Sequence, residues 1–180
     1  MEVMRVVELI RVLDWLDMAG IWALDGPRLE MLFNESPSAL AKSLSRHEGA
    51  GVIKRVCKDV YMNPRARSAP TEPLLALVSV IRPFDFSYLS LECVLSEAGW
   101  ISQVPMRYTV MTTGRSYLMT TPIGILEFTH TVRVPLSTDV VFDPFRGIHV
   151  AVPERALRDL RHVGRNLDLV KEGSDDGARV

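Results

Sequence analysis

Apolar residues recur at helical spacing in the first part of the chain. Between residues 3 and 18 they fall at nearly every third or fourth position, with charged residues between them: Val3, Val6, Val7, Ile10, Leu13, Leu16 and Met18. This period predicts an amphipathic helix that turns these side chains toward a core, and Gly20 supplies its end. A second helix is predicted over residues 27–33, with Asp25 as its cap and Pro27 in its first turn.

A third helix is predicted to begin after Ser36, with Pro37 at its first position. Leu40 and Leu44 are four residues apart, so they mark the side of this helix that faces inward. On or near the opposite side the sequence places four polar residues: Ser38, Lys42, Ser45 and Arg46. This helix is therefore amphipathic, and its outward side is polar and basic.

A short hairpin is predicted next. Residues 52–56 and 60–62 alternate as strands, a tight turn covers residues 57–59, and Asn63-Pro64 ends the second strand. Three short helices followed by a two-stranded hairpin is the element order of a winged helix-turn-helix. Residues 1–66 are therefore predicted to form such a domain.

The rest of the chain predicts a second domain. A stretch rich in proline, serine and alanine makes residues 67–73 the linker. Helices are predicted over residues 72–81 and within 86–100, and β-rich segments follow, interrupted by glycine and proline. A closing helix begins at Pro153 and runs to about residue 170, and residues 171–180 form a polar tail.

The predicted fold class is therefore α+β. An N-terminal winged helix-turn-helix precedes a small α+β domain, residues 74–170, with a mostly antiparallel sheet and a closing helix.

Charge is unevenly distributed along the chain. The net charge is −1, yet seven basic and two acidic residues lie between Lys42 and Arg67, a local net charge of +5. Such an asymmetry favours nucleic acid as a partner. The predicted DNA-binding residues are Ser38, Lys42, Ser45, Arg46, Lys54, Arg55, Lys58 and Arg65. The alternative is that these charges only solvate a hairpin and one side of a helix.

The closing helix carries a second series of basic residues. Their spacing of three, three and four residues predicts that they lie along one side of the helix: Arg155, Arg158, Arg161 and Arg165. This side is a possible second basic surface for DNA or for a protein partner. The alternative is a helix that only caps its domain, with Ala156, Leu157 and Leu160 buried.

No specific catalytic motif is present. The sequence has no phosphate-binding loop, no HExxH and no CxxC; its four histidines are scattered, and no lysine lies between Lys58 and Lys171. We therefore predict no catalytic residues, no metal site, no cofactor and no enzymatic activity. Cys57 and Cys93 suggest no disulfide framework, although Lys58 beside Cys57 is of the kind that lowers a thiol pKa. Without a signal peptide or an apolar span, a cytoplasmic protein with no membrane partner is expected.

Four stretches, in order over roughly residues 5–165, resemble AbiEi-type antitoxins of bacterial type IV toxin–antitoxin systems. "IKRVCKDVYMNP" resembles the family's LxRVxRGVYxxP, and "SYLSLECVLSEAGWISQVP" is similar to YxSxxSALxxxGL. "TPIGILEFTH" resembles TPxGxxEFxH, and "VAVPERALRDL" resembles AxPEKALxDLL. Asp59 stands where the family has glycine, Cys57 where it often has a basic residue, and Cys93 where it has a small one.

The resemblance implies an antitoxin that binds double-stranded DNA at repeats in its own promoter and represses its operon. It also implies a C-terminal domain that counters a nucleotidyltransferase-like toxin without forming a stable complex with it. From the residues alone, two other classes stay open. One is a winged-helix protein-interaction module or a general transcriptional regulator unrelated to a toxin, and the other is an enzyme on the C-terminal domain.

Overall fold

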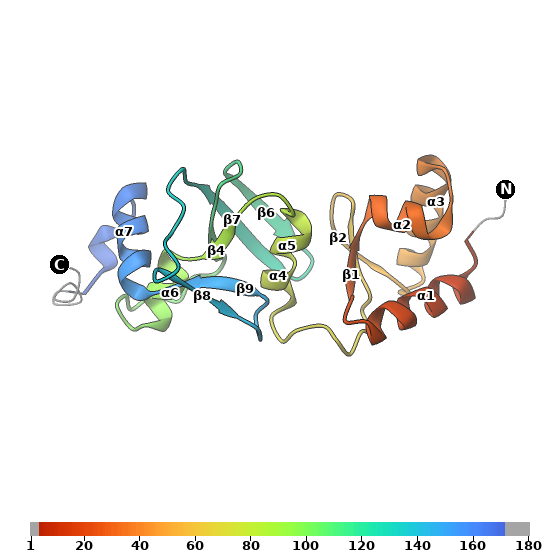
Figure 1. Cartoon of the computed structure of the whole chain (residues 1–180), viewed down its shortest axis with the longest axis horizontal. Coiled ribbons are helices and arrows are strands. Elements are labelled where there is room, and N and C mark those ends of the chain that lie inside the picture. Colours follow the sequence, from red (N-terminus) through yellow and green to blue (C-terminus); the bar gives the residue numbers. More distant parts are fainter. Residues whose placement is uncertain (1–3, 172–180) are drawn as a thin grey trace. The chain divides into compact units, whose positions relative to one another are not determined.

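The chain folds into two compact units that meet in sequence between Pro73 and Leu74. The computed structural model describes residues 4–171, and helices and strands occur in both units (Figure 1). The α+β class predicted from the sequence is therefore confirmed.

The first unit combines three helices with a small antiparallel sheet. Its helices are α1 (Val6–Met18), α2 (Gly26–Phe33) and α3 (Pro37–Gly49), and its strands are β1 (Ala23–Asp25), β2 (Lys54–Cys57) and β3 (Val60–Met62). The strand order is β1-β3-β2, so the hairpin of β2 and β3 gains β1 as a third strand. Strand β1 was not predicted from the sequence, because three residues are too few for an alternating pattern.

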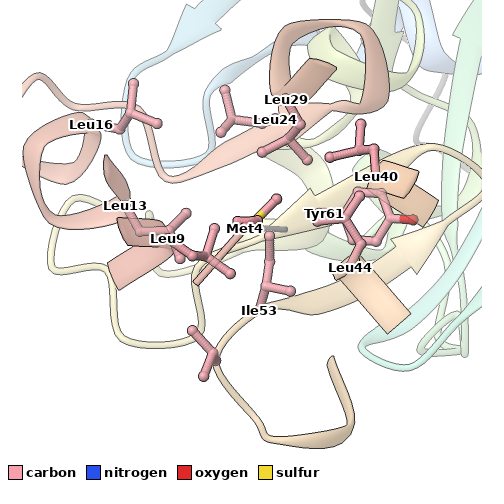
Figure 2. Close-up of a cluster of buried hydrophobic side chains, with 11 residues drawn as sticks. Met4, Leu9, Leu13, Leu16, Leu24, Leu29, Leu40, Leu44, Ile53 and Tyr61 are labelled. Carbon is pink, nitrogen blue, oxygen red and sulfur yellow. The ribbon is translucent and has the colours of Figure 1, made fainter. Parts of the chain in front are cut away.

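The core of this unit lies between its helices and its sheet (Figure 2). Leu9, Leu13 and Leu16 line the buried side of α1, and Leu40 and Leu44 line that of α3. The other members of this core are Met4, Leu24, Leu29, Val52, Ile53 and Tyr61. The expected apolar side of α1 was partly wrong, since Val6, Val7 and Met18 are exposed. Val3 lies outside the described residues.

The N-terminus of α2 has the cap that the sequence predicted. Asp25 Oδ1 accepts a hydrogen bond of 2.9 Å from the backbone N–H of Arg28. Because this bond satisfies one of the unpaired amides of the first turn, we expect Asp25→Ala to lower the free energy of unfolding by about 1 kcal/mol. Asp25→Ser should recover most of that loss in urea unfolding. Equal stability of all three proteins would contradict the capping role.

The predicted linker is attached to the first unit at its start. The backbone N–H groups of Arg67 and Ser68 donate to the two carboxylate oxygens of Asp17, each over 2.9 Å, and the Ser68 hydroxyl donates over 2.6 Å. These bonds, that of the Ser68 hydroxyl first, lower the pKa of Asp17. The carboxylate at the end of α1 therefore fixes the course of residues 67 and 68.

The second unit is built on a six-stranded mixed sheet. Its strands are β4 (Ser87–Leu89), β5 (Tyr108–Thr112), β6 (Tyr117–Thr121), β7 (Gly124–His130), β8 (Val140–Asp143) and β9 (Ile148–Ala151). In the order β6-β7-β5-β4-β9-β8, three pairings are antiparallel and the β4–β9 and β5–β7 pairings are parallel. Its helices are α4 (Pro73–Ala76), α5 (Val78–Ile81), α6 (Glu92–Glu97) and α7 (Pro153–Val163), with a 3₁₀ turn, η1 (Leu167–Leu169).

Three expectations for this unit need correction. The segment 86–100 is not one helix: β4 opens it, Leu91 turns the chain with a φ of 59°, and only then does α6 begin. Short apolar runs of this kind fit a buried strand as well as a helix. The helix expected over 72–81 is two short helices, and the closing helix ends at Val163, where Gly164 has a φ of 73°.

Candidate nucleic-acid interface

The side of α3 that faces away from the core brings three predicted residues together. Ser38, Lys42 and Ser45 are exposed, while Leu40 and Leu44 point into the core. They are four and three residues apart, which places them in one row on a helix. This row offers two hydroxyls and one ammonium group at the surface, groups that bind phosphates and the edges of bases.

The side chain of Arg46, unlike those of Ser38, Lys42 and Ser45, bonds to the N-terminal segment before α1. Its Nη2 donates a hydrogen bond of 2.8 Å to the carbonyl of Met4, and Nε2 of buried His47 lies 3.1 Å from the same oxygen. The backbone N–H of Met4 donates to the buried carboxylate of Glu35. Arg46 and His47 of α3 thus bind the carbonyl of Met4, and Glu35 of the α2–α3 connection binds its N–H. The Arg46 guanidinium is therefore engaged with the protein itself.

The hairpin presents its cations in distinct ways. Lys58 is exposed at the turn and Lys54 is half-buried on β2. Arg55 is exposed but held in place, because its Nε donates to the Cys57 carbonyl over 3.2 Å. The guanidinium carbon of Arg55 also lies 6.0 Å from the centre of the Tyr61 ring. Arg65 is exposed just beyond β3, and its N–H donates to Asn63 Oδ1 over 3.0 Å.

The turn of the hairpin explains one departure from the antitoxin motif. Asp59 has a φ of 58°, a left-handed conformation that glycine adopts freely and aspartate tolerates. The family's glycine would thus suit the turn that Asp59 makes here. Between Arg55 and Cys57 the strand pairing shifts register, which is a β-bulge.

Cys57 does not have the properties of a reactive thiol. Burial raises its pKa, Asp59 raises it further, and only Arg55 acts in the opposite direction. At neutral pH the thiol is therefore less ionised than that of a free cysteine. The basic neighbour Lys58 does not produce the lowered pKa that the sequence suggested.

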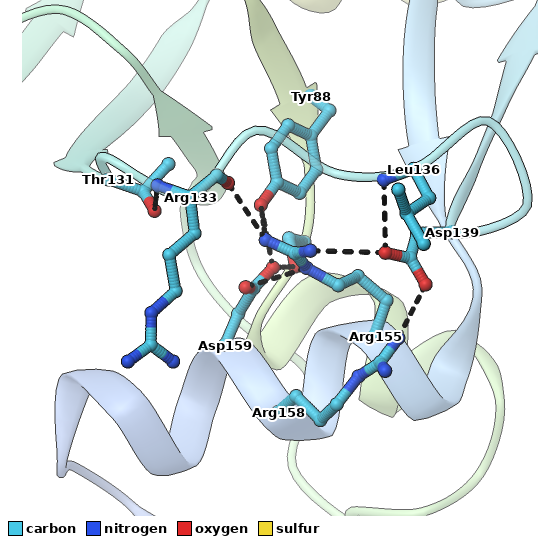
Figure 3. A network of polar contacts seen from close by, with 9 residues as sticks. Tyr88, Thr131, Arg133, Leu136, Asp139, Arg155, Arg158 and Asp159 are labelled. Carbon is cyan, nitrogen blue, oxygen red and sulfur yellow. Dashed lines mark hydrogen bonds and ion pairs between the residues drawn. The ribbon is translucent and has the colours of Figure 1, made fainter.

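The second basic surface predicted on α7 does not form as expected. Arg155 is only 8% exposed and lies in a network of polar groups that joins α7 to Tyr88 of β4 (Figure 3). Arg165 lies beyond the end of α7 and joins a different cluster. Only Arg158 and Arg161 of the predicted four are exposed, and Arg158 is hydrogen-bonded to Asp139. Spacing alone failed here because the prediction did not fix which side of α7 packs on the sheet.

The network around Arg155 uses most of its donors. Two of its bonds go to carboxylates: Nε donates to Asp159 over 2.9 Å and Nη1 to Asp139 over 3.2 Å (Figure 3). Nη2 donates to the Tyr88 hydroxyl over 2.9 Å and to the Arg133 carbonyl over 3.1 Å. Burial raises the pKa of Tyr88, and Asp159 adds to the rise. Burial would raise the pKa of Asp139, but the Leu136 N–H and the Arg158 guanidinium hold it below its usual value. These groups join β4, α7 and the segment before β8.

The cluster around Arg165 likewise neutralises two carboxylates, those of buried Glu92 and half-buried Glu127. Arg165 donates to both oxygens of Glu92, over 2.9 and 3.0 Å, and also to Glu127. Asn166 adds a bond of 2.7 Å to Glu92. Burial opposes ionisation of Glu92, yet these donors lower its pKa. The carboxylates are thus held in ion pairs, and within residues 4–171 no group of three or more metal-ligating side chains comes together.

These lowered pKa values predict an acid-sensitive second unit. Glu92 and Asp139 bind a proton less readily when folded than when unfolded, so the stability they contribute is present above their unfolded values, about 4. It is lost as the pH falls through the folded values. We expect unfolding in urea at pH 3 to need less denaturant than at pH 6. In Glu92→Gln the difference between the two pH values in the urea needed for unfolding should shrink. An equally large difference in this variant would show that Glu92 is not a source of the acid sensitivity.

Among the described residues, no helix is long and apolar enough to cross a membrane. Comparison of the whole chain with models of known protein families gives no match, and comparison with curated proteins gives none either. The resemblance to AbiEi-type antitoxins accordingly rests on the four quoted motifs, and the interface on the exposed groups of α3 and the hairpin.

Proposed function

We propose that the first unit is a winged helix-turn-helix that binds double-stranded DNA. The observation that carries the proposal is that exposed basic and hydroxyl groups occur on the outward row of α3, on the hairpin of β2 and β3, and at Arg65 just beyond it. The order α1, α2, α3 and hairpin supports the same proposal, with β1 as the strand that joins the hairpin to the helices.

In this proposal α3 enters the major groove with Ser38, Lys42 and Ser45 toward the base edges. Lys54, Arg55 and Lys58 lie along the adjacent phosphates, where they supply affinity and little sequence information. The hydrogen bond from the exposed Arg46 to the Met4 carbonyl competes with a contact to DNA. Arg46 therefore acts first in holding the helix in place.

Lys42 is the cation in the middle of the α3 row. We expect Lys42→Ala to weaken binding to the specific site by about 1–3 kcal/mol if its ammonium contacts a base. Binding to a scrambled duplex should weaken much less, because base contacts are absent there. Fluorescence anisotropy with both duplexes measures the difference. Equal losses on the two duplexes would place Lys42 on the phosphates.

The wider proposal is a non-enzymatic, cytoplasmic antitoxin of a type IV system that represses its own operon. It follows from the resemblance of the four motifs, two of which lie on the hairpin and on α7 with the strand before it. The second unit would counter a nucleotidyltransferase-like toxin without a stable complex. The ion pairs of Arg155 and Arg165, which bond to residues of other elements in this unit, support a rigid scaffold for such a role.

The deciding experiment is an anisotropy titration at two salt concentrations. The probes are the DNA immediately upstream of the gene and a scrambled duplex of equal length. Tight, salt-sensitive binding that prefers the upstream DNA would support the autorepressor and make the neighbouring gene the toxin candidate. Binding no better than to the scrambled duplex would overturn it and favour the protein-interaction module.

A further inference from the structure

Helix α1 has an outward side with an unusual order of residues. Opposite the buried Leu9, Leu13 and Leu16, the helix places Val7, Arg11, Asp14 and Met18 in one row. Their spacing of four, three and four residues is the spacing of the contact positions of a coiled coil. The two ends of the row are apolar and its middle carries one positive and one negative charge.

The side chains of this row are exposed and do not pack into the core of their own unit. Val7 is 54% exposed and Met18 is 82% exposed, and Trp15 beside the row is 59% exposed. Arg11 and Asp14 are exposed, and no hydrogen bond or ion pair joins their side chains to another residue of the described chain. Aromatic, methionine and arginine side chains are enriched in protein contacts relative to the rest of a protein surface, and this part of α1 exposes all three.

We propose that this row is a contact for a second copy of the same chain, with the two α1 helices antiparallel. In that orientation Val7 lies opposite Met18 of the second copy, and Arg11 lies opposite its Asp14. The twofold axis of the dimer repeats each pair once, so the two helices meet at four pairs of residues. A parallel pair would instead place Arg11 on Arg11 and Asp14 on Asp14, and charge complementarity therefore selects the antiparallel form.

The contact is small, and this sets its strength. A helix of 13 residues is about 20 Å long, so the pair buries less than the ~800 Å² per partner of a standard interface. The dimer is therefore weak and forms at high protein concentration, or when two copies lie side by side. The inference does not rest on DNA binding, and its test contains no DNA.

The test measures the average mass of the full chain by sedimentation equilibrium, from micromolar to near-millimolar concentration. Variants that reverse the charges of Arg11 and Asp14 are compared with the wild type. The wild-type mass should rise from the monomer value of 20.2 kDa toward twice that value. Arg11→Asp and Asp14→Arg should each weaken the dimer at least about tenfold, because like charges then face each other. The double variant, Arg11→Asp with Asp14→Arg, should restore it. Arg115→Glu, an exposed charge reversal in the second unit, is the control.

The register is tested by cross-linking in a Cys57→Ser background. A mixture of Val7→Cys and Met18→Cys proteins should form a disulfide-linked dimer on mild oxidation, since these positions face each other. Either protein alone should not. A monomer mass at all concentrations, no recovery in the double charge exchange, or equal cross-linking of the single variants would each overturn the antiparallel dimer.

Discussion

Arg155→Ala is expected to destabilise the second unit by about 3–5 kcal/mol, the largest effect of any single substitution considered. The change would leave the carboxylates of Asp139 and Asp159 buried without their shared cation, and would remove a donor from the Tyr88 hydroxyl. Amide hydrogen exchange of peptides from β9 and α7 would measure the loss. Peptides from α1 and α3 serve as the internal reference and should not change.

Two further variants separate a buried-charge effect from a simple loss of packing. Arg115→Ala removes an exposed arginine and should change stability by less than about 0.5 kcal/mol. Arg155→Met combined with Asp139→Asn and Asp159→Asn removes all three charges and should recover much of the loss. If the triple variant were as unstable as Arg155→Ala, the ion pairs would not be the reason for the effect.

Removing the three hairpin cations together is expected to change how DNA binding depends on salt. In a protein with Lys54→Ala, Arg55→Ala and Lys58→Ala, the slope of log K against log salt should become shallower by about 2.7, or about 0.9 per phosphate contact. Affinity for the upstream DNA and for a scrambled duplex should fall together, since phosphates carry no sequence information. Anisotropy titrations over a range of salt concentrations measure both quantities.

The control for the hairpin variant is Arg115→Ala, which removes a cation from the second unit. Its salt slope should equal that of the wild type. An unchanged slope in the hairpin variant, with the protein still folded by circular dichroism, would show that β2 and β3 do not touch the phosphates. A loss restricted to the upstream DNA would instead assign base contacts to the hairpin.

The parts of the fold that were predicted correctly depend on local signals. Pro37 and the Leu40–Leu44 pair fixed α3, and Asp25 with Pro27 fixed the start of α2, because capping and periodicity act within one or two turns. Residues 86–100 were predicted wrongly for the opposite reason. Tyr88 and Leu89 belong to a strand because β5 and β9 lie on either side of it, and those partners come later in the chain.

The candidate site shows the same division. Exposure of Lys42 follows from the period of its own helix, and it was predicted. Engagement of Arg46 by the Met4 carbonyl joins residues far apart in sequence, and no local pattern indicates it. Burial of Arg155 was missed although Asp159, four residues later, was a visible partner on the same helix. The sequence contains Arg155 and Asp159 at a spacing that allows an ion pair, but it does not show which side of α7 packs on the sheet.

The strand order of the second unit bears on how the chain folds during synthesis. Strand β4 lies inside the sheet, yet its parallel partner β9 follows it by some sixty residues, since Tyr88 pairs with His149. Pairings so distant along the chain are slow to form, whereas the strand pairing of Ala23 with Met62 in the first unit spans 39 residues. The first unit should therefore be complete while the second still exposes both edges of β4. In a growing chain, the unit proposed to bind DNA would fold before the C-terminal unit is finished.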